Sequence, residues 1–436
     1  MLLLLAFIFL PLFASSPSAA ATLSLTQAVR EAESGSPLIK KAESSLEELR
    51  WKRTEALSNF LPTVNANASY LLDKKYALFD TVVGGNAASF PQVIPSASFG
   101  LGAKIPLYDA WAGVDRYRAA GDFLQAGHLD LNLTRFQVDR EIVLLYYRAL
   151  GAKLLQDVAA QNVMALEDHL REIQLFKKAG VSTNYDVLRV EVQVSEAKYA
   201  YLDASDNVAL SKQRLAQALG KPFDDRSLTG ELPVLKPELL HTIREKSDEE
   251  RSDLQSLRAK VGALEKLENA SSAYFSPKLF LFADYQRYNN RNTKAWPADS
   301  AFRDSYGLGV GMSWNLFDGM LSIARSKETV EQRVQSELGL RIAELRAVGD
   351  FELWQRKYLY YCSVYAARLN DVEKARESVR LAKAGRKVGA RTNSDLLDAE
   401  SDFNRAQAGL INSQLGSIEA LLNLELATGR RIFNFY

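Results

Sequence analysis

Cysteine is nearly absent from this chain of 436 residues. The single cysteine, Cys362, excludes an intrachain disulfide and a cysteine metal cluster. Histidine is also scarce, and His128, His169 and His241 lack metal-ligand spacing, so we interpret them as solvated or capping side chains. The net charge of +1 gives no basic footprint for nucleic acid. The sequence therefore predicts no catalytic site, no metal and no cofactor.

An apolar helix long enough to span a membrane is also missing. The apolar run at residues 1–13 is shorter than the roughly 20 residues that such a helix needs. Small residues follow it and offer A-x-A-like cleavage sites, so we predict a signal peptide over residues 1–21. No Lys or Arg follows Met1, which leaves a membrane anchor as the alternative.

Proline is missing from two very long segments, each of which ends in a tight, glycine-containing reversal. The first segment, residues 109–178, would be a helix of roughly 105 Å at 1.5 Å per residue. Apolar residues recur at threes and fours along it and along the segment that returns. We therefore predict two long antiparallel helical hairpins with coiled-coil-like packing, at residues 109–219 and 318–428.

The chain contains two copies of one pattern. KKAGVSTNYDVLRVE at residues 177–191 aligns without gaps with RKVGARTNSDLLDAE at residues 386–400. Each copy runs in the order helix, strand, loop, strand, long helix, tight turn, long helix. The predicted parts are a first repeat at 22–220, a connector at 221–248, a second repeat at 249–429, and a tail at 430–436 that we interpret as packing.

Four segments of about ten residues alternate apolar and polar side chains, as strands do. They are residues 62–72, 97–107, 277–288 and 306–316. The polar positions are mostly Gly, Ser and Asn, although Phe280 and Phe282 blur the third segment. Membrane-crossing strands have this length. A soluble β-sandwich alternates too, but a glycine-rich face would pack poorly as its core.

Four strands cannot close into a barrel, and lipid tolerates no open sheet edge. Closure must therefore involve further copies of the chain. Two copies would give eight strands with a filled interior, whereas three give twelve strands and a lumen. The predicted fold class is an α+β membrane protein. Its long helical hairpins would form an α-barrel, and its four strands would join a trimeric, twelve-stranded outer-membrane β-barrel.

The order of elements, the duplication and the segment KVGARTNSDLLDAE resemble the outer membrane efflux protein (TolC) family. The resemblance covers about residues 25–429. It implies a homotrimeric exit duct in the outer membrane that extends into the periplasm and is not an enzyme. It also implies a periplasmic adaptor and an inner-membrane pump or ABC transporter as partners, in efflux or type I secretion. A periplasmic coiled-coil adaptor or scaffold without a membrane barrel is the alternative.

The two reversals between long helices are the candidate functional sites. They consist of Gly180, Val181, Ser182 and Thr183 in the first tip and of Gly389, Ala390, Arg391 and Thr392 in the second. The glycines permit sharp left-handed turns, and each Thr has an Asp three residues later, the spacing of a helix cap. Capping alone explains the features that both copies share. We also predict that both tips dock a periplasmic adaptor.

The second tip carries charges that the first lacks. Asp398 follows Asp395 by one turn, whereas the first copy has Arg189 where Asp398 would be. Threefold symmetry would make two stacked carboxylate rings, which favour cations. The resemblance implies that Asp395 and Asp398 line the periplasmic entrance and that Arg391 helps to hold it shut.

One position departs from the family pattern. Where family members carry a tyrosine that bonds to the aspartate matching Asp186, this chain has Arg386. A salt bridge between Arg386 and Asp186 is the expected replacement for this closure contact.

Overall fold

The computed structural model describes residues 22–72, 78–91, 95, 97–222, 224–242, 251–289 and 302–436. The predicted signal peptide lies outside these residues. The chain divides into two compact units. The first, here called the helical unit, comprises residues 1–43, 131–252 and 343–436, and the second, the strand unit, comprises residues 44–130 and 253–342.

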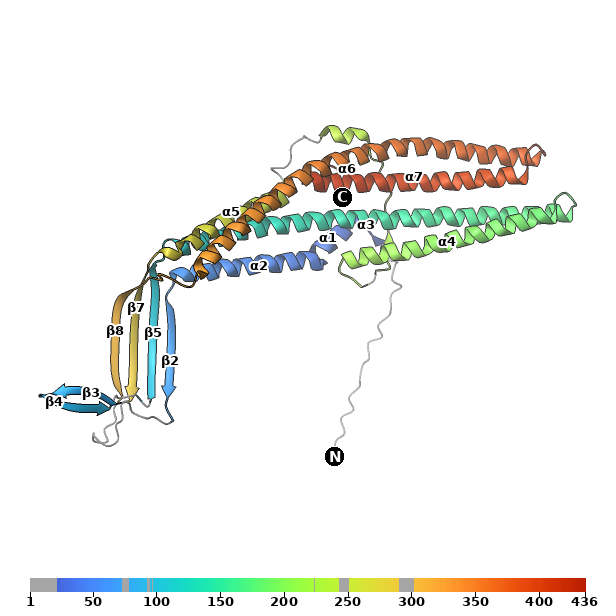
Figure 1. The fold of residues 1–436 in the computed structure, drawn as a ribbon. Coiled ribbons are helices and arrows are strands. Elements are labelled where there is room, and N and C mark those ends of the chain that lie inside the picture. The colour runs from blue at the N-terminus through green and yellow to red at the C-terminus, as the bar shows by residue number, and fades with distance from the viewer. Residues whose placement is uncertain are drawn as a thin grey trace, which may run out of the picture. The chain divides into compact units, whose positions relative to one another are not determined.

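The strand unit is built on a four-stranded antiparallel sheet (Figure 1). Its strands, in spatial order, are β2 (Thr63–Tyr70), β5 (Ala97–Tyr108), β7 (Lys278–Asn289) and β8 (Arg303–Ser313). All four predicted strands are therefore present. β2 and β8 form the edges and each pairs on one side only within the described chain.

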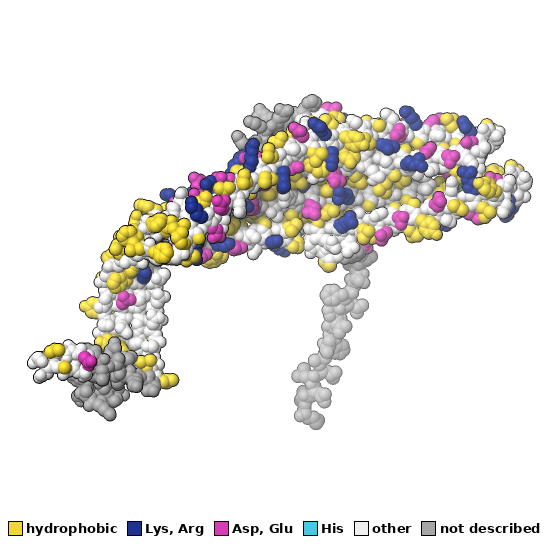
Figure 2. Space-filling model, viewed as in Figure 1, with side chains coloured by type: hydrophobic (Ala, Val, Ile, Leu, Met, Phe, Trp, Pro, Cys, Tyr) yellow, Lys and Arg dark blue, Asp and Glu magenta, His cyan; other side chains and the backbone are white. Residues whose placement is uncertain are grey.

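The register places apolar side chains together on one face of this sheet. Leu101 lies opposite both Ala66 and Tyr285, and Tyr285 lies opposite Tyr306. The other face carries the glycines of β5 and β8 with Asn65 and Asn67 of β2, as the alternation predicts. Figure 2 shows a sheet face that is mostly white, with few hydrophobic or charged side chains. One face is therefore apolar, and the other is mostly small and polar apart from Lys104, Phe280 and Phe282.

A second hairpin lies between β2 and β5, where the sequence predicted only a loop. β3 (Leu78–Val83) and β4 (Asn86–Pro91) pair through a two-residue turn. Gly84 and Gly85 occupy this turn with φ of +61° and +86°. Two successive positive φ values are what the favoured two-residue hairpin turn requires, and glycine adopts them without steric cost. The interpretation of residues 73–96 as a loop was therefore wrong over residues 78–91.

The two long helices begin with the same capping arrangement. α3 (Ala112–Lys178) follows the motif LYD, which ends at Asp109, and α6 (Leu321–Lys387) follows the motif LFD, which ends at Asp318. Asp109 Oδ2 accepts a 2.6 Å hydrogen bond from the Gly113 N–H, and Asp318 Oδ2 accepts one of 3.1 Å from Ser322. These contacts satisfy amides in the first turn, so the duplicated LYD and LFD motifs are helix-start signals.

The helical unit contains most of the two predicted hairpins, since α3 enters it at residue 131 and α6 at residue 343. α3 returns as α4 (Asn184–Ala218), α6 returns as α7 (Asn393–Thr428), and both tips lie at the same end of the unit (Figure 1). α1 (Leu25–Gly35) lies in this unit, α2 (Pro37–Leu57) begins in it, and α5 (Ser252–Ser272) starts at its last residue. Among the described helices, none is both long and apolar enough to cross a membrane.

The two hairpins pack against each other near their tips. One buried cluster combines Leu166 and Ile173 of α3 with Leu397 of α7. The α4 members of this cluster are Val187, Val190, Val194 and Ala197. Their spacing is that of one helix face, so α4 turns an apolar stripe toward α3.

The connector is held by tyrosines of the long helices. β1 (Thr22–Leu23) pairs in parallel with β6 (Ser227–Leu228). The Tyr146 hydroxyl of α3 accepts the Thr229 N–H at 3.1 Å, and Tyr358 of α6 donates to the Lys236 carbonyl at 2.8 Å. The 3₁₀ helix η2 (Pro237–Thr242) follows.

The C-terminal tail packs on a buried ion pair, in keeping with its interpretation as a packing segment. Arg140 of α3 and Glu425 of α7 form this pair, with side chains 2% and 0% exposed. Glu425 Oε1 also accepts the N–H groups of Ile432 at 2.7 Å and Phe433 at 2.9 Å. Arg140 donates to the Tyr436 hydroxyl at 3.1 Å. The pair therefore ties α3, α7 and the tail together.

Candidate functional site

Both tips make the same reversal. Gly180 has φ of +76° and Gly389 has φ of +74°. The Val181 N–H reaches back to the Phe176 carbonyl at 2.9 Å, and the Ala390 N–H reaches the Gly385 carbonyl at 2.8 Å. This is the Schellman arrangement, in which a left-handed glycine lets the last carbonyls of a helix be satisfied. Each long helix therefore ends at a glycine because the backbone requires one.

The returning helices start with complete capping boxes. Thr183 Oγ1 accepts the Asp186 N–H at 3.2 Å, and Asp186 Oδ2 accepts the Thr183 N–H at 2.9 Å. Thr392 and Asp395 repeat this exchange at 3.2 and 2.8 Å. Hydrogen bonds from Thr183 and Thr392 lower the pKa of the two aspartates, which therefore remain ionised at neutral pH. Both aspartates are caps, as the spacing predicted.

The Arg391 side chain in the second tip lies against Gly385 near the end of α6. A Cβ on Gly385 would lie 2.6 Å from Arg391 Cγ, so only glycine leaves room for this side chain. The first copy has Phe176 at the position of Gly385 and Ser182 at that of Arg391. Asp398 is exposed, and no hydrogen bond or ion pair joins it to another described residue. The second tip therefore presents one guanidinium and one unpaired carboxylate to its surroundings.

Arg386 does not contact Asp186 as expected. Its guanidinium forms an ion pair with Glu172 of α3 and lies over the Phe176 ring at 5.9 Å. Asp186 is instead occupied by Ser182 and Thr183 of its own tip. The suggested salt bridge is therefore wrong for this chain, because a carboxylate on the facing helix and the local cap satisfy the two groups separately.

His169 is another correction. It is only 4% exposed and bonds to the side chain of Asn393, the first residue of α7. Its Nδ1 lies 2.8 Å from Nη1 of Arg386. A guanidinium can only donate, so Nδ1 accepts this hydrogen bond and the ring hydrogen lies on Nε2. Burial and the Arg386 charge lower the pKa of His169 and keep it neutral. His128 is exposed, as predicted. The side chain of His241 lies outside the described residues.

These contacts form a polar lock between the hairpins. The lock comprises His169 and Glu172 of α3, Arg386 of α6 and Asn393 of α7. Arg189 of α4 adds a 2.5 Å hydrogen bond to Ser394 Oγ. Sequence reasoning missed the lock because its contacts join α3 to residues more than 200 positions later in the chain. The only hint in the sequence was that the first repeat has Arg189 where the second repeat has Asp398.

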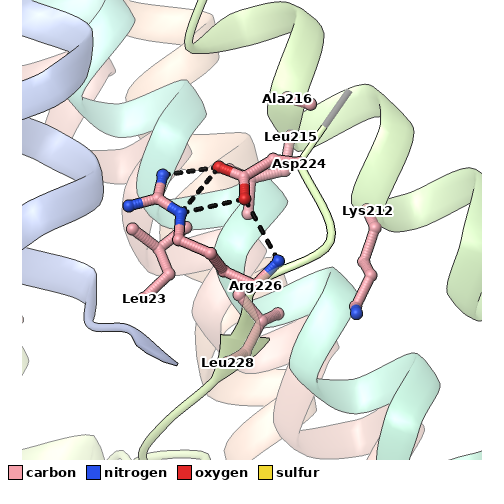
Figure 3. Close-up of a pocket in the computed structure, with 7 residues that line it drawn as sticks. All are labelled: Leu23, Lys212, Leu215, Ala216, Asp224, Arg226 and Leu228. Carbon is pink, nitrogen blue, oxygen red and sulfur yellow. Dashed lines mark hydrogen bonds and ion pairs between the residues drawn. The ribbon is translucent and has the colours of Figure 1, made fainter. Parts of the chain in front are cut away.

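Potential metal ligands do not cluster in the part of the chain that the structure describes. No group of three or more that could hold a metal ion occurs among the described residues. The pocket in Figure 3 is lined by Asp224 and Arg226 of the connector. Arg226 donates two 2.7 Å hydrogen bonds to Glu31, which lowers the pKa of Glu31 to about 2, and Asp224 accepts from its Nε at 2.9 Å. These charges are mutually satisfied, so the cluster fastens α1 to the connector.

The chain is similar to proteins of a known family. The family model described as Outer membrane efflux protein matches residues 28–221 and 244–430. The chain belongs to the outer membrane efflux protein family. The match spans both repeats, which confirms the predicted family and fold class, an outer-membrane location and a role as an exit duct. It favours the duct over the adaptor alternative.

Two relatives and one solved structure show the degree of similarity. The chain is 21% identical to the outer membrane protein TolC of Vibrio cholerae, over 96% of this chain and 95% of that protein. It is 23% identical to the alkaline protease secretion protein AprF of Pseudomonas aeruginosa, over 76% of this chain and 69% of that protein. Its fold is similar to that of the outer membrane protein VceC of Vibrio cholerae. That structure gives a TM-score of 0.74 at 16% identity, over 94% of this chain and 97% of that one.

Proposed function

We propose that three copies of this chain form a duct through which substrates leave the periplasm and cross the outer membrane. A periplasmic adaptor and an inner-membrane pump or ABC transporter would deliver the substrate, in efflux or type I secretion, and the chain itself would catalyse no reaction. The observation that carries this proposal is the four-stranded sheet with one apolar face and two edges. Lipid excludes open edges, and three copies supply twelve strands around a lumen.

Aromatic side chains at the helix ends of the strands support the membrane placement. The exposed residues there are Tyr108, Trp111, Phe275, Trp314 and Phe317. Aromatic residues of this kind gather where a barrel meets the membrane–water interface. They would mark the periplasmic boundary of the lipid in the proposed trimer.

An exposed stripe on α4 supports assembly of several copies. Its members are Tyr185, Leu188, Val192, Tyr199 and Leu202, which recur at threes, fours and sevens. Such a stripe is typical of a helix that packs against another helix. In the proposed trimer, a helix of the next copy covers it.

The second tips would form the closed entrance. Arg391 supplies a fixed positive charge at each tip, and the partly exposed Asp395 and exposed Asp398 lie on the following helix turns. An exposed ionic contact is worth only about 0–1 kcal/mol. Threefold repetition in a narrow mouth adds these contributions, so Arg391 would hold the entrance shut while the aspartates select cations.

We expect Arg391→Ser to increase single-channel conductance severalfold in planar bilayers, because it removes the closing charge from all three tips. Asp395→Ala with Asp398→Ala should instead bring cation selectivity close to that of a neutral pore, since six carboxylates disappear. Asp186→Ala is the matched control: it removes the same cap and one carboxylate per copy from the first tip but leaves both proposed rings of the second tip in place. Unaltered ion selectivity in the double variant would assign Asp395 and Asp398 to capping alone.

A further inference from the structure

Two phenylalanines and a lysine interrupt the polar face of the sheet at its helix end. Lys104 Nζ of β5 lies 3.7 Å from the centre of the Phe280 ring of β7. The rings of Phe280 and Phe282 lie 6.2 Å apart at 52°. We call Lys104, Phe280 and Phe282 the cation–aromatic band. A lysine this close to a ring face is stabilised by the ring electrons.

The backbone of β8 is shaped to accept these rings. A Cβ on Gly311 would lie 2.5 Å from Phe280, and one on Gly309 would lie 2.9 Å from Phe282. Both distances are too short for a side chain, so the rings lie directly over glycine backbone. Gly307, one step further along β8, has nothing within 4 Å of such a Cβ. The two glycines under the rings therefore fix the position of the band.

The lysine of the band has no carboxylate partner among the described residues. Its register neighbour is Phe282, and the nearest acidic position on the same face, Asp284, lies opposite Gly102. Asp284 Oδ1 is 3.1 Å from where a Cβ of Gly102 would stand. The Lys104 side chain is exposed, whereas both phenylalanines are half-buried. The band thus offers an ammonium without a direct contact to any described carboxylate, beside two half-buried rings.

The band lies on the face opposite the apolar one, which in the proposed trimer faces the lumen. Each copy would place one ammonium and two rings at the same level, so three copies make a ring of three lysines and six phenylalanines. Rings in a polar, water-filled passage offer apolar contact, and the ammonium groups select negative charge.

We propose that the cation–aromatic band is a lumenal binding site for organic anions that carry an aromatic ring. This inference rests on the proposed function, because only the assembled duct has a lumen. Lys104 binds the anionic group, and Phe280 and Phe282 pack against the ring of the passing molecule. The site differs in sign from the aspartates of the second tip, so one duct would contain an acidic mouth and a basic, aromatic site at the helix end of the sheet.

The test uses the full-length channel in planar bilayers, with probes added from the side of the β3–β4 hairpin. Naphthalenesulfonate is the aromatic anion, methanesulfonate the anion without a ring, and benzyltrimethylammonium the aromatic cation. We expect naphthalenesulfonate to block at a concentration about tenfold lower than either control probe. Equal block by the three probes would overturn the proposal without any variant being needed.

Variants then separate the two halves of the band. Lys104→Gln should abolish the preference for naphthalenesulfonate over benzyltrimethylammonium. Phe280→Leu with Phe282→Leu should abolish its preference over methanesulfonate. Gln286→Ala, further along the same face of β7, is the control that should leave block unchanged. Open channels whose block is the same in all variants would contradict the binding site, whereas failure of the wild-type chain to form channels would contradict the proposed function.

Discussion

Replacing both tip glycines with valine is expected to reduce export to background while the trimer still assembles. Gly180 and Gly389 have φ near +75°, where a β-branched residue is strongly disfavoured. No atom lies within 4 Å of a Cβ at either position, so the loss would come from the backbone and not from a clash. The reversal would open, and the surface that we propose for the adaptor would be lost. Export measured in cells, alongside trimer content of the outer membrane, checks this.

Asparagine supplies the matched control for the tips. Asn tolerates the left-handed conformation better than any β-branched residue, so Gly180→Asn with Gly389→Asn should retain most of the export. Loss of export in the valine variant alone would support a conformational requirement. Normal export with valine at both positions would contradict docking at these tips.

Arg140→Met is expected to lower stability by about 3–5 kcal/mol, because it leaves Glu425 charged and buried without its partner. Glu425 also anchors two amides of the tail, and those contacts would weaken with it. The matched control joins the same two helices at the surface: Arg148 and Glu419 pair at 2.9 Å with side chains 44% and 41% exposed. Arg148→Met should cost only about 0–1 kcal/mol.

Thermal unfolding followed by the helical circular dichroism signal compares the two variants. A large drop in melting temperature for Arg140→Met, with little change for Arg148→Met, is the expected result. Equal drops would show that the buried pair contributes no more than the exposed one, and that the tail is held by its aromatic contacts. Those contacts include Tyr147 against Phe435, whose ring centres lie 5.8 Å apart.

The elements that were predicted from the sequence depend on local periodicity. The hairpins follow from proline-free segments and from threes-and-fours spacing, and the strands follow from alternation over about ten residues. The capping boxes at Thr183 and Thr392 were predictable because all their atoms lie within four residues. The β3–β4 hairpin was missed because its strands are only six residues long.

The contacts that were missed join distant parts of the chain. No local pattern pairs His169 with Asn393 or directs Arg386 to Glu172, since these pairs form only after the hairpins pack. In the sequence, Phe280 and Phe282 only break the alternation of apolar and polar residues in the third strand. The two rings lie over glycines of β8, the neighbouring strand. This packing can be recognised only when the register between β7 and β8 is known.

The central claim is that three copies complete one duct, because a four-stranded sheet with two edges cannot stand alone in lipid. Native mass measurement of the detergent-extracted outer-membrane protein tests it most directly. We expect a single species with the mass of three mature chains. A stable monomer, folded and extracted under the same conditions, would contradict it.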